Sequence, residues 1–241
     1  MDSEEILWST VEAYEAIASS YRRRAWDIVK RVAKLCREMG TFLDAGCGPG
    51  HNAVLLLSEY PKARGVLVDL SKAMVKRAQS SIELAGLKHR ALLVVSDVRS
   101  LPLRSESMEL CLYIAVIHHL PERAWRINAL REAWRVLKDS GVALITSWSI
   151  AQRSFVKCVA MNFFKKLVKP SISLGDCIKV SIVRGTTYRR YYHLYTLGEL
   201  KRDVQGSGFI VVQAGKYIAL GRAVALQKNL FVVGLKKFIK G

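Results

Sequence analysis

Three glycines at alternate positions, Gly46, Gly48 and Gly50, follow the acidic Asp44 in the segment TFLDAGCGPG of residues 41–50. A short apolar run precedes them and a helix-like run follows, so the expected order is strand, turn, helix. Glycine permits positive φ and a close approach of the backbone to a ligand, and a helix N-terminus offers N–H groups to an anion. The segment predicts a turn that cradles a ligand, with an ordinary loop as the alternative.

A further acidic residue, Asp69, ends the apolar run Val66–Val68. Nucleoside-binding α/β folds place an acidic residue on the ribose hydroxyls about twenty residues after such a turn. The glycines lack the two intervening residues that the dinucleotide pattern has between its second and third glycines. Together these features indicate a nucleoside-type ligand.

Strands and helices that position these residues alternate along the chain. Apolar runs predict strands at 91–96, 108–117 and 142–148, and helices at 72–84, capped by Ser71, and at 122–137. The runs 209–213 and 230–233 are expected to form a hairpin-like pair at the sheet edge. This alternation predicts an α/β fold: a doubly wound, Rossmann-like sheet of seven mostly parallel strands with helices on both faces. Ligands should lie at the carboxyl ends of its strands.

Residues 1–241 are interpreted as a single domain with two additions. Residues 1–39 are expected to be helical, and their periodicity predicts helices that pack over the sheet. Residues 151–195 form a basic insertion, in which 151–170 predicts an amphipathic helix and 171–187 a loop or a small insertion. Thr196 is expected to cap a short helix that follows.

Charge is distributed unevenly along the chain. The whole sequence has 38 Lys and Arg against 20 Asp and Glu, and residues 151–241 hold 17 of the basic residues but only 3 of the acidic ones. Such asymmetry predicts a polyanionic partner, nucleic acid first, with an extremophile surface or a membrane-surface patch as alternatives. No apolar run has the length of a membrane span, so no membrane partner is expected.

The five cysteines, at positions 36, 47, 111, 158 and 177, are odd in number and form no CxxC pair. Reduced thiols inside the cell are therefore expected, with neither a metal site nor a disulfide framework. The acidic start Met1–Glu5 argues against a signal peptide. These features together predict a cytoplasmic protein.

The segments DAGCGPG and VDLS resemble motif I and the acidic loop after it in class I S-adenosylmethionine-dependent methyltransferases. The resemblance implies S-adenosylmethionine as the cofactor, with its methionine part on the glycine turn, its ribose on Asp69 and its adenine beside Asp97 and Val98. The segment YEAIASSYRRRAW resembles the part of this family that closes over the cofactor. The cofactor-binding residues implied in this way are Asp44, Gly46, Gly48, Gly50, Asp69, Leu70, Asp97, Val98 and Ala115.

Methyl transfer from a sulfonium is an in-line displacement that needs alignment and exclusion of water, and no protein nucleophile or metal. His118 and His119 follow the fourth strand, where the methyl group should point. Either ring could orient a substrate, accept a proton or bind an anion. The alternative is a packed histidine whose ring nitrogens are satisfied by the backbone.

Three further segments, AVIHHLPERAWR, EAWRVLKDSGVALITSWS and RRYYHLYTLGEL, resemble the tRNA wobble-uridine methyltransferases. That family methylates the carboxylate of 5-carboxymethyluridine, and the resemblance covers about residues 10–215. The sequence departs from the family at residues 49–52, where it has PGHN, and at the single Arg123 with a displaced Arg126. Both departures bear on the identity of the substrate and not on methyl transfer.

A carboxylate acceptor is ionised at neutral pH, so it needs orienting cations more than a general base. The candidate catalytic residues are His118, His119, Arg123, Arg189, Arg190 and His193. The candidate contacts to tRNA are Arg126, Lys165, Lys166, Lys169, Tyr191 and Tyr192. The tyrosines could stack on an anticodon base or pack in the core.

The third strand is expected at a sheet edge, and its residues Ala91–Val95 carry no charge. Exposed apolar edges are usually covered. The resemblance implies a small zinc-binding activator that adds a strand along 91–96, and the alternative is protection by a loop or by the twist of the sheet.

Two other functions stay open on the sequence. One is methylation of a small carboxylate or phenolic metabolite, which the basic C-terminal third disfavours. The other is a catalytically silent RNA-binding module, which the intact set of Asp44, Gly46, Gly48 and Asp69 disfavours.

Overall fold

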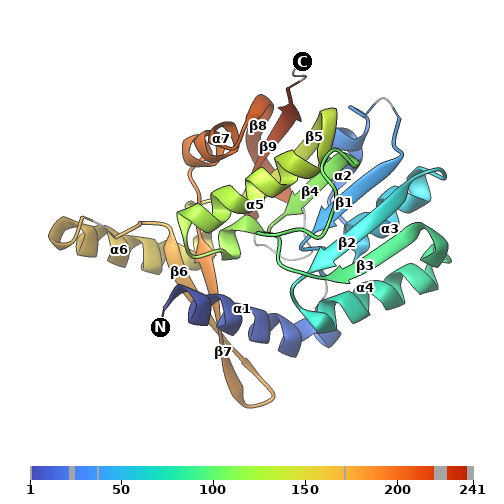
Figure 1. The fold of residues 1–241 in the computed structure, drawn as a ribbon. Coiled ribbons are helices and arrows are strands. Elements are labelled where there is room, and N and C mark those ends of the chain that lie inside the picture. The colour runs from blue at the N-terminus through green and yellow to red at the C-terminus, as the bar shows by residue number, and fades with distance from the viewer. Residues whose placement is uncertain (1, 22–24, 37, 171, 220–226, 238–241) are drawn as a thin grey trace.

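The computed structural model describes residues 2–21, 25–36, 38–170, 172–219 and 227–237. Its centre is a seven-stranded sheet in the order β3-β2-β1-β4-β5-β9-β8 (Figure 1). The strands are β1 Thr41–Ala45, β2 Arg64–Asp69, β3 Ala91–Val95, β4 Met108–Ile114, β5 Leu137–Trp148, β8 Phe209–Ala219 and β9 Gln227–Lys236. The first five are parallel, and β9 runs antiparallel to both β5 and β8. The predicted α/β fold and the terminal hairpin are confirmed.

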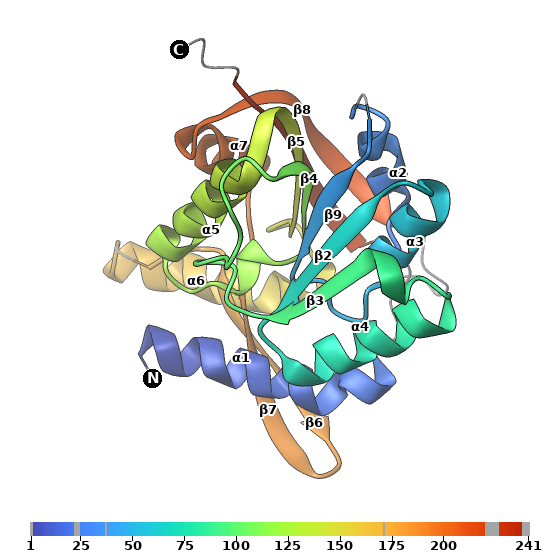
Figure 2. The same cartoon turned by 45° about the vertical axis from the view of Figure 1, so that its right-hand side comes forward.

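Helices cover both faces of this sheet, as the two views in Figures 1 and 2 show. One face packs on α5 and α7, and the other on α2, α3 and α4. The helices are α1 Ser3–Ile17, α2 Asp27–Ala33, α3 His51–Glu59, α4 Lys72–Leu84, α5 Arg123–Val136, α6 Val156–Val168 and α7 Leu197–Gly206. Short 3₁₀ turns are η1 Ala18–Ser20, η2 Lys88–Arg90, η3 Ile117–His119 and η4 Arg153–Phe155. No helix in the described residues is both long and apolar enough to cross a bilayer.

Local sequence explains where the main elements begin. The Ser71 hydroxyl accepts a hydrogen bond from the Met74 N–H at 3.1 Å and caps α4, as predicted. The predicted cap Thr196 does the same for α7 by accepting from the Glu199 N–H. The central strand β4 is buried along nearly its whole length, as expected for a parallel strand covered on both faces.

Residues 171–187 were predicted as a loop or a small insertion, and the prediction of a loop is wrong because these residues contain a strand. Strand β6 (Asp176–Val183) pairs antiparallel with β7 (Thr186–His193) in a separate two-stranded sheet. Arg184 and Gly185 turn the chain with φ of 49° and 81°, as a two-residue hairpin loop requires. Ile178, Val180 and Ile182 alternate with polar residues, which is the period of a strand, and they lie exposed on the hairpin.

Strand β5 begins at Leu137, which is earlier than the predicted 142. Ser140 and Gly141, residue types that are common in turns, lie inside this strand, with Ser140 at φ 62°. The register between β4 and β5 shifts at the same level, between Met108 and Leu110. The residues of a turn thus act here as an irregularity within a continuous strand.

A disulfide joins Cys158 of α6 to Cys177 of β6, so the expectation of reduced thiols was wrong for these two residues. The sequence places them 19 residues apart, and only the unpredicted hairpin brings them together. Cys36, Cys47 and Cys111 carry free thiols.

Candidate active site

A cavity opens at the carboxyl ends of the parallel strands, beneath α1. The loops after β1, β2 and β4 and the segment after β3 form its floor, and α1 and the residues that follow it form its roof. From the floor it is lined by Gly46, Gly48, Asp69, Leu70, Asp97, Val98, Ala115 and His119, and from the roof by Leu7, Thr10, Val11, Tyr14, Tyr21 and Trp26. Of the nine predicted cofactor residues, Asp44 and Gly50 do not line this cavity.

The glycine turn has the conformation that its sequence predicts. Gly46, Gly48 and Gly50 have φ of 66°, 52° and 78°. A Cβ on Gly46 would lie 2.4 Å from a methyl carbon of Val116, whereas one on Gly48 would meet no atom within 4 Å. Gly48 therefore leaves open space for a ligand. A Cβ on Gly50 would instead lie 3.1 Å from the Cβ of Ala78, so Gly50 allows the start of α3 to approach α4 closely.

Asp69 connects two loops at the cavity wall. Its Oδ2 accepts from the Gly48 N–H and its Oδ1 from the Ser71 N–H, both at 2.9 Å. Burial raises the pKa of this carboxyl to about 6, while these N–H groups act in the opposite direction. A carboxylate has about four acceptor positions, so Asp69 can order the glycine turn and still accept from a ligand.

Asp44 lies beneath the same turn and is 1% exposed. Neither of its oxygens receives a hydrogen bond of normal geometry. Burial, reinforced by the charge of Asp69, raises the pKa of Asp44 to about 7. A buried carboxyl without a partner favours a cationic group in the cavity nearby.

Asp97 is held on the adjacent wall by Arg99. Its oxygens accept from the Arg99 N–H at 2.7 Å and from Nε at 2.9 Å. Arg99 also pairs with Glu4 of α1 at 3.0 Å and lies 4.1 Å over the ring of Trp125. Asp97 faces the cavity, and the contacts of Arg99 with residues of several elements fix its orientation.

Ala115 is a strained residue at the end of β4. It has a positive φ of 60°, which is uncommon for a residue with a Cβ. Its N–H donates to both the carbonyl and the hydroxyl of Thr146, at 3.2 and 2.9 Å. Strain of this kind concentrates at functional sites, and Ala115 lines the cavity beside His119.

Helix α1 is anchored on both sides of the cavity. The Glu15 carboxylate accepts from the Ala73 N–H at the start of α4, at 3.2 Å to each oxygen. Thr10 accepts from the Tyr191 N–H of β7 at 3.0 Å. These contacts hold Leu7, Thr10 and Tyr14 over the cavity, and a helix N-terminus stabilises the negative charge of Glu15.

His119 is the predicted catalytic residue that reaches the cavity. Its Nδ1 lies 2.8 Å from the Tyr191 carbonyl, which can only accept, so Nδ1 carries a proton. In the neutral ring Nε2 is then the acceptor, and the Tyr14 hydroxyl lies 2.8 Å from it. Tyr14 was not predicted as a site residue, although it lies at helical spacing in the segment that resembles a lid.

His118 does not line the cavity, and its ring packs edge-on against that of His119, with 4.3 Å between the ring centres. It is 1% exposed, and its Nδ1 lies 3.3 Å from the Ser147 hydroxyl and 3.4 Å from the Trp148 N–H. Its ring stacks on Tyr192. The alternative of a packed histidine therefore describes His118, and the prediction of direct contact with substrate is corrected for it.

The predicted arginines are dispersed. Arg123 pairs with the fully buried Asp203 at 2.8 Å, and Arg189 is exposed on β7. Arg190 donates to the Ser181 hydroxyl at 3.1 Å, and its guanidinium carbon lies 5.6 Å from the ring centre of Tyr14. None of the three lines the cavity, and Arg190 is connected to it through Tyr14.

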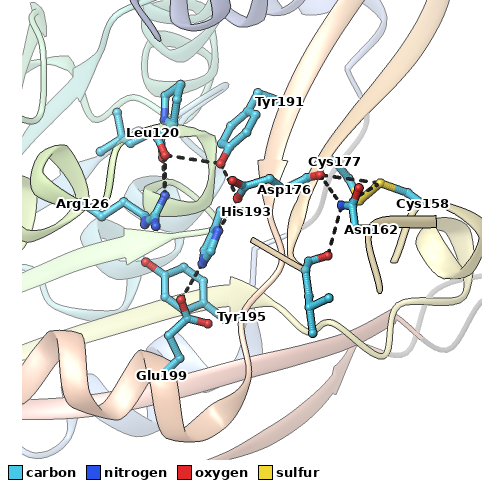
Figure 3. A network of polar contacts seen from close by, with 12 residues as sticks. Leu120, Arg126, Cys158, Asn162, Asp176, Cys177, Tyr191, His193, Tyr195 and Glu199 are labelled. Carbon is cyan, nitrogen blue, oxygen red and sulfur yellow. Dashed lines mark hydrogen bonds and ion pairs between the residues drawn. A yellow bond between two sulfur atoms is a disulfide. The ribbon is translucent and has the colours of Figure 1, made fainter. Parts of the chain in front are cut away.

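Arg126 is 4% exposed, so the prediction that it contacts tRNA is wrong for this conformation. Its Nη1 donates to the carbonyls of Leu120 and Pro121 at 2.9 and 2.8 Å (Figure 3). It supports the loop after His119 from below.

His193 lies in a buried polar network rather than at the cavity (Figure 3). Its Nδ1 is 2.6 Å from Asp176 and its Nε2 is 2.7 Å from Glu199. Burial lowers the pKa of His193, but the hydrogen bonds to both carboxylates outweigh it and raise the pKa. Tyr191 donates to the same Asp176 oxygen at 2.7 Å. The network joins β6, β7 and α7, so His193 supports the site instead of touching substrate.

The predicted tRNA contacts divide into buried tyrosines and exposed lysines. Tyr191 and Tyr192 are 6% and 1% exposed, so the prediction that they stack on a base is wrong for this conformation. Lys165, Lys166 and Lys169 are exposed, on α6 and at its C-terminal end. Across the described residues, no group of three or more His, Cys, Asp or Glu could hold a metal ion.

Residues 42–141 match the protein family described as a methyltransferase domain. A methyltransferase of Encephalitozoon cuniculi is 33% identical over 198 residues, which cover 82% of this chain and 83% of that protein. The chain belongs to the class I S-adenosylmethionine-dependent methyltransferases. It is an enzyme of that class, and the cofactor of this class is S-adenosylmethionine.

Other relatives of this methyltransferase bear more specific names. A Schizosaccharomyces pombe protein named tRNA (carboxymethyluridine(34)-5-O)-methyltransferase is 26% identical over 218 residues, covering 85% of this chain and 90% of that protein. A Methanosarcina mazei S-adenosylmethionine-dependent methyltransferase has a similar structure, with a TM-score of 0.73 and 18% identity over 90% of this chain and all of that one. A methyltransferase in complex with the Haloferax volcanii activator Trm112 has a TM-score of 0.67 and 17% identity, covering 96% and 98%. At these identities the two structures show the shared fold alone.

Proposed function

We propose that this methyltransferase transfers a methyl group to the carboxylate of a modified wobble uridine in tRNA, forming the methyl ester. The observation that carries the proposal is the match to the S. pombe tRNA methyltransferase along nearly the full length of both chains. The basic C-terminal third supports a nucleic-acid substrate.

The cavity residues fit S-adenosylmethionine. We propose that Gly46 and Gly48 hold its methionine part, where Gly48 borders open space and the partnerless Asp44 lies beneath the turn. Asp69 would accept from the ribose hydroxyls, and Asp97 and Val98 would flank the adenine, with Leu70 and Ala115 completing the walls. The cofactor supplies an electrophilic methyl group on a sulfonium. Gly50 would act by shaping the turn, and Asp44 by the electrostatic field of its carboxyl group. Neither would contact the cofactor directly.

The acceptor side needs orientation more than proton transfer, because a carboxylate is already ionised at neutral pH. We propose His119 and Tyr14 for this role, since both face the cavity and share a hydrogen bond. A protonated His119, or the Tyr14 hydroxyl, could donate to a carboxylate oxygen and fix it for in-line attack. Arg190 beside Tyr14 would add positive charge, with Arg189, Arg123 and the buried His118 and His193 in supporting positions.

The segments around the cavity take matching roles. We propose that residues 1–39 form the lid and that 151–195 form the substrate-side insertion of one cytoplasmic methyltransferase domain. Lys165, Lys166 and Lys169 of that insertion would contact tRNA phosphates.

A partner at β3 is the remaining part of this proposal. β3 is the outermost strand of the described sheet, and its Leu92 and Val95 are 58% and 44% exposed. The H. volcanii activator Trm112 forms a complex with a methyltransferase of the same fold. We propose that a small zinc-binding activator adds a strand along 91–96.

Tritium transfer from labelled S-adenosylmethionine to total tRNA, followed by nucleoside analysis, tests the function. The label should appear in a wobble nucleoside and be released by mild base, because an ester hydrolyses. Asp69→Ala serves as the cofactor-deficient control. Label in small acids or phenols but not in tRNA would favour a metabolite methyltransferase. Failure to bind the cofactor in calorimetry would favour a silent module.

A further inference from the structure

Helix α6 carries an apolar surface that nothing in the described chain covers. Phe164, Leu167 and Val168 are 67%, 71% and 90% exposed. Val156, Met161 and Phe163 on the same helix are each more than half exposed. At 100° per residue these six side chains fall within an arc of about 160°, interrupted only by Lys157.

The orientation of α6 is fixed by the opposite side of the helix. Cys158 is bonded to Cys177, and the Asn162 amide donates to the carbonyls of Asp176 and Leu174 at 2.8 and 3.3 Å (Figure 3). Phe155, just before the helix, is buried against Trp148 and Tyr192. The small anchored side therefore faces the protein, and the apolar arc faces away from it.

Positive charge borders this arc. Lys165 and Lys166 lie on its two sides at helical spacing, and Lys169 follows the helix. Residues 151–175 contain five basic residues and no acidic one. Pairing α6 with a second copy would bring two such sets of charges together, so a negatively charged surface is the complementary occupant.

We infer that α6 docks on the surface of an anionic lipid bilayer, with its apolar arc among the acyl chains and its lysines at the headgroups. A helix with Phe and Leu on one face and Lys at its borders is the form that lies in a membrane interface. RNA accounts for the lysines and for aromatic stacking, but it offers no apolar environment for Leu167, Val168 and Met161. In Figures 1 and 2, α6 lies at the periphery beyond the central sheet, where a flat surface can reach it.

Sedimentation of the full-length protein with vesicles tests this inference. Vesicles of phosphatidylcholine with phosphatidylglycerol should retain the protein, and vesicles of phosphatidylcholine alone should retain far less. The triple variant Phe164→Ser, Leu167→Ser, Val168→Ser should weaken retention by roughly 100-fold, since three apolar side chains lose their burial. Replacing Lys165, Lys166 and Lys169 by Gln should also weaken it, by about 100-fold at low salt.

Leu84→Ser is the matched control, because Leu84 is 90% exposed on the distant α4. It should leave vesicle binding unchanged, and cofactor binding by each variant should confirm that it folds. Binding that depends on the lysines but not on the apolar residues would overturn the inference, as would no retention by anionic vesicles. Methylation of tRNA without vesicles should be unchanged in the apolar variant, so this test is separate from that of the proposed function.

Discussion

Two carboxyl groups lie at one glycine turn, the buried Asp44 and the partly exposed Asp69, and desolvation raises their pKa values to about 7 and about 6. In the unfolded chain an aspartate titrates near 3.9. At pH values between the unfolded pKa and each raised native pKa, the native state therefore still binds a proton that the unfolded state has released. Stability from this source is complete below about pH 4 and decreases as the pH rises to about 7.

Asp44→Asn should reduce this pH dependence, because the amide has no charge to bury. Between pH 5 and pH 8 the parent should lose on the order of 2–3 kcal/mol more unfolding free energy than the variant. Urea unfolding at both pH values measures the difference. The exposed Asp139→Asn is the control, and equal pH dependence in parent and Asp44→Asn would show that Asp44 is ionised throughout.

Asp69→Ala should weaken binding of S-adenosylmethionine by about 1–3 kcal/mol, the range for hydrogen bonds to a charged group. The structure adds a second reason, since Asp69 also accepts from Gly48 in the turn that would hold the cofactor. Isothermal titration calorimetry measures the change, with Asp139→Ala as the control. An unaltered affinity in a folded variant would mean that Asp69 does not hold the ribose.

Adjacent residues can have opposite roles that no sequence pattern separates. His118 and His119 are consecutive after β4, and the 3₁₀ turn η3 points one ring into the core and the other at the cavity. Glycines and aspartates at strand ends have a recognisable spacing, so the sequence predicts them as cofactor residues, and their contact with the cofactor stays a prediction. The acceptor side could not be predicted in this way, because Tyr14 reaches His119 across 105 residues of sequence.

At the scale of elements, the disulfide is the main tether of α6, because only a small part of this helix is buried. Reduction of this disulfide should lower the free energy of unfolding by about 3 kcal/mol, given the length of the loop that it closes. The double variant Cys158→Ser, Cys177→Ser should have the same effect. Scanning calorimetry with and without reductant measures it. The double variant is the control, and it should not respond to reductant. If the parent protein melts at the same temperature with and without reductant, the disulfide does not stabilise the attachment of α6.

Reversing Lys165, Lys166 and Lys169 to Glu should weaken binding to all tRNAs alike, since phosphate contacts carry no sequence information. Parent affinity should also fall steeply as salt rises. Filter binding across a salt series measures both effects. The exposed Lys62, away from the insertion, provides the matched reversal as a control. Affinity indifferent to salt and to the triple change would place the tRNA elsewhere.

The hairpin β6–β7 shows where reasoning about elements stops. Its Ile178, Val180 and Ile182 alternate with polar residues as in a strand, yet their side chains are exposed and have no partner layer in the described chain. The aromatic stretch of β7 suggested an RNA surface, yet the structure packs Tyr191 and Tyr192 inward. A run of cations and aromatics has the same composition whether its rings face a base or a core.

At the scale of the whole molecule, the open edge at β3 predicts a heterodimer. Expression alone should give poorly soluble or weakly active protein, and co-expression with the activator should raise both. Leu93 packs toward the core, so Leu92→Lys is the better substitution to prevent copurification. Leu84→Lys on α4 is the control. A soluble and fully active monomer purified alone would show that the activator is not required.

The position of β9 has a consequence for biosynthesis. β9 follows both β5 and β8 along the chain but lies between them in the sheet, pairing with each. A nascent chain that has not yet delivered residues 227–236 to the exit of the ribosome therefore holds β5 and β8 apart, each with an unpaired edge. Such edges template aggregation, and pairings over long sequence separations form late. Completion of the sheet must wait for this strand, so a chain stalled before it should be captured by chaperones while a released chain folds.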